Sequence, residues 1–157
     1  MSTITIKTQA ELDKLPDSFK EFTWIEIRSK AGTWIKVSKP YENAVVRAFD
    51  SSQVLAFDSS QVEAYHSSQV QAFGSSQVKA FGSSQVVAWD SSQVWAHHFS
   101  KIEAYDSSQV FIQDEYTNPD QKTLAYDNAI VHSKDVRKII LARAHGNTSR
   151  NKLSDSA

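Results

Sequence analysis

The sequence contains no cysteine. This excludes a disulfide framework, a thiolate nucleophile and a zinc site built on cysteine ligands. No run approaches the roughly 18 consecutive apolar residues of a membrane-spanning helix. The first residues also lack the basic segment and apolar run of a secretory signal. These absences predict a soluble cytoplasmic protein with no membrane partner.

Excess charge and catalytic motifs are also missing. Lysine and arginine number 17 against 18 aspartates and glutamates, giving a formal net charge of −1. A nearly neutral chain exerts no strong overall attraction on nucleic acid, so we expect no such partner. There is no glycine-rich phosphate loop, no nucleophile-elbow motif and no glycine-rich aspartate pattern of calcium-binding rolls. We therefore expect no enzymatic activity, no cofactor and no metal site.

What the chain does contain is an eight-residue unit, repeated without a gap from Ala48 to Val110. Its consensus is Ala, aromatic, Asp/Gly/His, Ser, Ser, Gln, Val and a variable residue, numbered here as positions 1 to 8. Position 7 is Val or Ile in every full unit, whereas position 8 ranges from Lys79 to Trp95. Because side chains alternate along a strand, positions 1 and 7 and the second Ser should face inward. Positions 2, 6 and 8 should face outward.

The third position of the unit predicts a corner. It holds only Asp, Gly or His, residue types that are enriched at positive φ. A tight turn with one left-handed residue accounts for this column without metal binding or catalysis. Each unit is therefore interpreted as one short strand followed by a corner.

Stacked units of this kind predict a mainly β fold, a β-solenoid. Its interior of Ala, Val and Ser suits a thin core between two sheets, which favours two units per coil; three units, forming a triangular prism, remain the alternative. We expect a small α/β N-terminal cap over residues 1–39 and the solenoid over 40–132, with a loop insertion at about 113–124. A short C-terminal cap over 133–144 and a flexible tail over 145–157 complete the prediction.

Local signals refine the two ends. Ile4 and Ile6 suggest a short strand, and the spacing of Thr8 and Glu11 matches a capping box that opens a short helix. The segment 40–47 is interpreted as a degraded unit in the same frame. Near the C-terminus, Ser133 could cap a helix through 136–140, but a final strand over 139–141 competes with that interpretation.

The repeat resembles that of the octapeptide-repeat β-solenoid proteins found as hypothetical proteins in bacteria and phages. It is more distantly similar to the sixteen-residue solenoid of bacterial ice-nucleation proteins. The resemblance covers about residues 40–132 and implies the architecture, not an activity. No threonine lies between Ala48 and Phe111, and the outward residues are bulky, so ice binding is poorly matched.

With two units per coil, alternate units share a face. One face shows Arg47, Glu63 and Lys79 in alternating sign, as an exposed ladder requires. The other is apolar, and we expect it to be a protein-binding interface, most simply that of a homodimer. Its predicted residues are Leu55, Phe57, Phe73, Val87, Trp89 and Tyr105.

Other roles for this apolar face remain open. Aromatic side chains that merely stack and stiffen the sheet, or that form a platform for carbohydrates or bases, are the alternatives. The expected function is thus non-enzymatic protein binding, to a second copy and to another protein. A phage or mobile-element inhibitor of a host protein complex is one role that fits a compact binder of this type.

Overall fold

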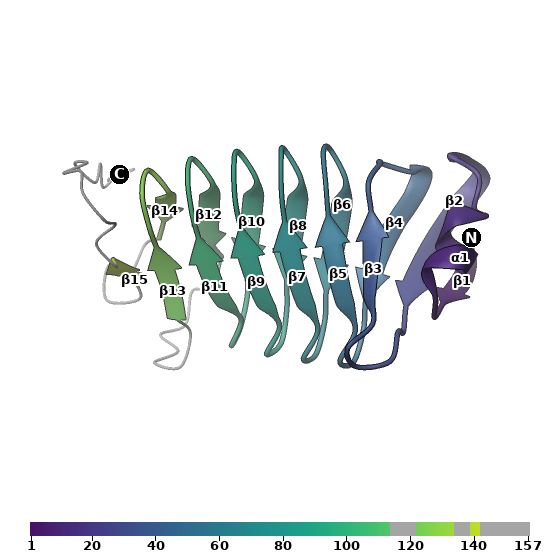
Figure 1. Ribbon diagram of the computed structural model, residues 1–157, viewed down its shortest axis with the longest axis horizontal. Helices are drawn as coiled ribbons and strands as arrows, with labels where there is room; N and C mark the ends of the chain where they lie inside the picture. The colour runs from purple at the N-terminus through teal and green to yellow at the C-terminus, as the bar shows by residue number, and fades with distance from the viewer. Residues whose placement is uncertain (114–121, 134–138, 142–157) are drawn as a thin grey trace.

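The structure is a computed structural model that describes residues 1–113, 122–133 and 139–141. Its strands are parallel and lie in two sheets that face each other across a narrow interior. Figure 1 shows the coils following one another along the long axis, with the helix at the N-terminal end. The chain is a β-solenoid, as the repeat predicts.

Successive repeat units form strands that alternate between the two sheets. Sheet A has the order β1-β2-β4-β6-β8-β10-β12-β14, and sheet B has the order β15-β13-β11-β9-β7-β5-β3. Each coil therefore holds two units, and the triangular alternative is wrong. The repeat strands are β5 (Gln53–Ala56), β6 (Gln61–Ala64), β7 (Gln69–Ala72), β8 (Gln77–Ala80), β9 (Gln85–Ala88), β10 (Gln93–Ala96), β11 (Lys101–Ala104) and β12 (Gln109–Ile112).

The core consists of the side chains that the alternation places inward. In β7, Val70 is 1% exposed and Ala72 is 0% exposed, and the second Ser of each unit, such as Ser76, is also buried. Burying a valine side chain stabilises the fold by about 1.5–3 kcal/mol. Ser52 Oγ donates a hydrogen bond to the carbonyl of Ile27 at 2.9 Å, which bridges two coils.

The corners have the predicted left-handed residue at position 3. The φ angles there lie between 53° and 64°. The residues are Asp50, Asp58, His66, Gly74, Gly82, Asp90, His98, Asp106 and Asp127. Asp90 Oδ2 also accepts a hydrogen bond from the N–H of Gly74 at 2.9 Å, one coil earlier. In the degraded unit at 40–47 the left-handed residue is Asn43 rather than Glu42. The frame is nevertheless kept at the end of this unit, because Val46 and Arg47 pair with Val62 and Glu63.

The N-terminal segment lengthens both sheets. Its elements are β1 (Ser2–Ile6), α1 (Gln9–Asp13), β2 (Ser18–Ile27), β3 (Trp34–Val37) and β4 (Glu42–Ala48). The predicted first strand and short helix are confirmed, and Glu11 accepts a hydrogen bond from the N–H of Thr8 at 3.2 Å. β1 and β2 extend sheet A, whereas β3 ends sheet B. Leu12 of α1 is 2% exposed and belongs to the same hydrophobic core as the coils.

The last described strands are β13 (Lys122–Ala125), β14 (Ile130–His132) and β15 (Ile139–Leu141). The predicted loop reaches too far, because its last three residues belong to β13. Ala104 pairs with Ala125, so the longer spacing between them is absorbed before β13 begins. At 139–141 the strand interpretation is confirmed and the helix is wrong. Residues 134–138 and the tail at 145–157 lie outside the described residues.

Candidate functional site

The six predicted interface residues lie together on the outward face of sheet B. Gln53, Gln69 and Gln85 align in one column, because β5, β7 and β9 pair in register. Leu55, Gln71 and Val87 form the second column, and the position-2 aromatic residues form the third. All six predicted residues are half-buried. The face runs on to Lys36 in β3 and to Glu103 in β11 at its two ends.

The aromatic residues of this face form one continuous stack, called here the sheet B ladder. Its members are Phe57, Phe73, Trp89, Tyr105 and Tyr126. Successive ring centroids lie 4.8, 4.7, 5.7 and 4.5 Å apart, with interplanar angles of 13° or less. Lys36 Nζ lies 4.9 Å from the centroid of Phe57 and covers the N-terminal end of the ladder.

The ring geometry determines what the ladder exposes. The planes of these rings are nearly parallel. Two such rings with centroids 4.7 Å apart cannot lie side by side in one plane, because their atoms would overlap. The rings must instead overlap face to face, in the offset-stacked arrangement that aromatic pairs favour. Phe73 and Trp89 therefore have both faces covered by their neighbours, and they direct ring edges outward.

One polar contact terminates the apolar part of the sheet B face. The hydroxyl of Tyr105 donates a hydrogen bond to Glu103 Oε2 at 3.1 Å. Burial of the hydroxyl is the largest cause, and this hydrogen bond to a carboxylate the second, of a rise in the pKa of Tyr105 to about 12. Both effects favour the neutral phenol, so Tyr105 remains an uncharged donor at physiological pH.

The N-terminal half of sheet A carries a connected group of charges. Arg47 Nε lies 3.0 Å from Glu63 Oε2, and Lys79 Nζ lies 3.6 Å from Glu63 Oε1. The guanidinium of Arg47 also lies over the ring of Trp24, with Cζ 3.1 Å from its centroid. The hydroxyl of Tyr65 donates to Glu63 at 3.0 Å; burial of the hydroxyl, together with this hydrogen bond, raises the pKa of Tyr65. These groups satisfy one another within the sheet.

The C-terminal half of sheet A holds an aromatic group that was not among the predicted site residues. Trp95 stacks on Phe111 at 5.5 Å, and Phe111 stacks on His132 at 4.6 Å. Phe81 and His97 stack beside them at 4.6 Å. The signal was available in the sequence, because position 8 of this sheet changes from Lys79 to Trp95 and Phe111.

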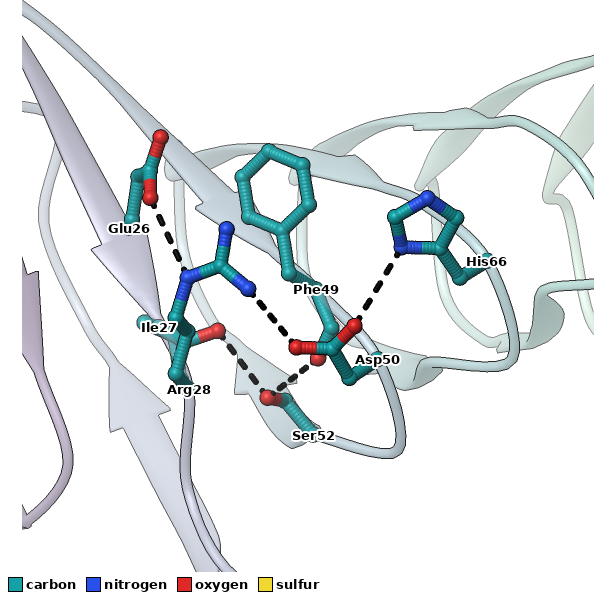
Figure 2. A network of polar contacts seen from close by, with 7 residues as sticks. All are labelled: Glu26, Ile27, Arg28, Phe49, Asp50, Ser52 and His66. Atoms are coloured by element: carbon teal, nitrogen blue, oxygen red, sulfur yellow. Dashed lines mark hydrogen bonds and ion pairs between the residues drawn. The ribbon is translucent and has the colours of Figure 1, made fainter.

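The corner that follows β4 contains a network of polar contacts, which extends to the end of β2 (Figure 2). Arg28 Nη1 donates to Asp50 Oδ2 at 2.7 Å, and His66 Nδ1 lies 3.6 Å from Asp50 Oδ1. The side chains of Asp50 and His66 are 62% and 63% exposed, so the contact is a surface one. Among residues 1–113, 122–133 and 139–141, no group of three or more His, Cys, Asp or Glu side chains is placed to hold a metal ion.

Comparison with protein-family models, with curated proteins and with solved structures finds no match to this chain. In the part of the chain that the structure describes, no helix has the length and apolar character needed to cross a membrane.

Proposed function

We propose that this β-solenoid is a non-enzymatic protein-binding module that self-associates through the outward face of sheet B. The observation that carries the proposal is a run of three strands without an outward charge. On β5, β7 and β9 the outward side chains are only glutamine, Leu55, Val87 and aromatic residues. The matching strands of sheet A carry Arg47, Glu63 and Lys79 instead.

The charges that flank this run resemble the rim of an interface. Lys36 lies at one end of the uncharged strands, and Glu103 lies at the other. Protein interfaces typically combine a core depleted of charge with a polar rim. The aromatic group of sheet A, around Trp95 and Phe111, has a described charged neighbour, Lys79, on one side only. It therefore lacks a charged rim at both ends and is the weaker candidate for an interface.

The orientation of the rings favours a protein partner over a stacking ligand. A sugar or base that binds by stacking requires a free ring face. In the sheet B ladder the interior faces are occupied by neighbouring rings, and ring edges with Leu55 and Val87 form the surface. Such a surface packs well against another apolar sheet. A different protein, such as the host complex that an inhibitor would block, would compete with the second copy for it.

The test is sedimentation equilibrium of the protein and of two lysine variants. Gln71→Lys introduces a charge into the centre of the sheet B face, where its neighbours on β5 and β9 are Leu55 and Val87. It should convert a dimer to a monomer, because the buried ammonium has no partner. Position 8 carries lysine at Lys79, so the fold itself tolerates the change.

Trp95→Lys is the control, since it places a lysine at position 8 of sheet A. It should leave the dimer intact. A wild-type protein that stays monomeric at high micromolar concentration would overturn the proposal. Dissociation by Trp95→Lys and not by Gln71→Lys would also overturn it, because it would move the interface to sheet A.

A further inference from the structure

We infer that two copies pair face to face with their solenoid axes antiparallel. In this arrangement β7 lies on the twofold axis, and Lys36 of each copy lies beside Glu103 of the other. This inference rests on the proposed self-association and specifies its register. It follows from the order of the strands in sheet B and from the charges at the two ends of the uncharged run.

When the strands of the two copies are aligned, two face-to-face arrangements of identical sheets have twofold symmetry. If the twofold axis runs along the solenoid, each strand lies over the same strand of the second copy. The position-6 column of one copy then faces the position-2 column of the other. If the axis runs along the strands, the columns stay in place and the order of the strands is reversed. In both cases the position-8 column, which is the central one, faces the position-8 column of the second copy. The two arrangements differ in which residues of this column meet, so its charges distinguish them.

The parallel arrangement brings like charges together. Lys36 would face Lys36 of the second copy, and Glu103 would face Glu103. Opposed like charges at an interface disfavour an arrangement strongly. The parallel arrangement is therefore excluded by the same residues that bound the uncharged run.

The antiparallel arrangement with β7 on the axis pairs opposite charges. It places β3 over β11 and β5 over β9 of the second copy. Lys36 then faces Glu103, and Leu55 faces Val87. In the position-6 column Trp34 faces Lys101, an arrangement that permits a cation–π contact.

Shifting the register by one strand removes this match. With the axis between β5 and β7, Lys36 faces Val87 and Glu103 has no partner strand in the described part of sheet B. With the axis between β7 and β9, Glu103 faces Leu55. Each shift places a charge against an aliphatic side chain, which costs desolvation without a compensating pair. The charges thus select one register.

The size of the contact sets the expected affinity. Five strands about 4.8 Å apart and strands of about five residues at about 3.3 Å each cover roughly 400 Å² of each sheet. The total, about 800 Å², lies below the roughly 1,200–2,000 Å² of stable specific interfaces and in the range of weak, transient ones. We therefore expect a weak dimer with a dissociation constant in the micromolar range.

A charge-reversal cycle tests the pairing by sedimentation equilibrium. Lys36→Glu and Glu103→Lys should each weaken the dimer about tenfold, because two symmetry-related pairs become repulsive at once. The double variant K36E/E103K should restore the wild-type dissociation constant. Thermal melting of each variant shows that the fold is retained. If the wild type dimerises and the reversals change nothing, the register is overturned while the proposed self-association stands. If no dimer forms at any concentration, the proposed function itself is overturned.

Crosslinking gives an independent test, because the chain has no cysteine of its own. Facing sheets pack about 10 Å apart, too far for a disulfide, so a short bis-maleimide is the probe. Gln71→Cys should crosslink with itself, since Gln71 lies on the axis. Leu55→Cys should crosslink with Val87→Cys in a mixture and not with itself. Efficient self-crosslinking of Leu55→Cys would instead indicate the parallel arrangement and overturn the inference.

Discussion

Single residues at the corners determine how sharply each coil turns. The third position has φ near +55° whether it holds Asp or His, and φ of +64° at Gly74 and Gly82. Left-handed backbone costs most L-residues about 1–2 kcal/mol, but Asn, Asp and His tolerate it better. This explains why the sequence alone identified the corner: the residue types in that column share a conformational property rather than a chemical one.

Gly74 allows the cost of the corner to be measured. A Cβ at this position would lie 3.2 Å from the backbone nitrogen of Asp58, one coil away. We expect Gly74→Val to lower the free energy of unfolding by about 2 kcal/mol or more, because it adds a β-branched side chain at positive φ to a close contact. Gly74→Asn should cost less than about 1 kcal/mol, as Asp occupies the neighbouring corners. Chemical denaturation measures both.

Gly32 provides the control for this comparison. It also has a positive φ, of 83°, but a Cβ added there would meet no described atom within 4 Å. Gly32→Val should therefore report the backbone strain without the close contact. If Gly74→Val and Gly74→Asn unfold at the same denaturant concentration, the left-handed corner is not what limits residue choice at position 3.

At the N-terminal end, a side chain of α1 pairs with the edge strand of sheet B. The side-chain amide of Gln9 in α1 imitates a strand: its Oε1 accepts from the N–H of Lys36 at 2.7 Å, and its Nε2 donates to the carbonyl of Lys36 at 3.1 Å. Exposed strand edges are templates for aggregation. Gln9 occupies the edge of β3, which ends sheet B.

Removing this amide should expose the edge. We expect Gln9→Ala to destabilise the protein by about 1 kcal/mol and to cause slow aggregation, because the N–H and carbonyl of Lys36 lose their partners. Gln9→Glu is the matched variant, since it keeps an acceptor for the N–H and loses the donor, and it should be intermediate. Static light scattering during prolonged incubation measures the effect. Equal solubility of all three proteins would show that α1 protects the edge by other means.

Sequence alone predicted the helix but not this role for it. The capping-box spacing of Thr8 and Glu11 is local, so it can be recognised without a structure. The contact between Gln9 and Lys36 joins residues 27 positions apart, and it depends on where α1 lies relative to β3. The same limit applies to β13, whose start at Lys122 is set by pairing with β11 rather than by its own residue types.

At the scale of the whole molecule, the spacing of the repeat units was enough to predict most of the architecture. The small inward residues Ala and Val predicted two sheets and two units per coil, and both are confirmed. The frame also assigned each outward residue to a sheet, which is why the six predicted interface residues lie together. It failed where the repeat degrades, at Asn43 and near β13, because no periodic neighbour constrains those positions.

Deletions of one or two units separate coil stacking from interface formation. Deleting residues 69–84 removes one coil of two strands, β7 and β8, and leaves every later strand in its own sheet. Solenoids of stacked repeats tolerate such changes with a modest loss of stability. Lys36, Leu55, Val87 and Glu103 then still match a second copy, with the axis moved between β5 and β9. We expect a folded dimer with a lower melting temperature.

Deleting only residues 69–76 is the control. It transfers the later strands to the opposite sheet, so that Lys79 and Trp95 follow Leu55 on the sheet B face and the charge match is lost. This variant should fold as a monomer, as measured by circular dichroism and sedimentation. A dimer that survives the eight-residue deletion and not the sixteen-residue one would contradict the assignment of the interface.

In the proposed dimer, the constant step between coils would make the length of the solenoid a recognition property. Lys36 and Glu103 lie four strand steps apart in sheet B, or about 19 Å. A related chain with one additional coil between them would hold the same two charges about 5 Å farther apart. Such a chain could pair with its own kind but could not satisfy both ends of a shorter one. Chains built from this unit would sort themselves by size, using a measure that no single residue encodes.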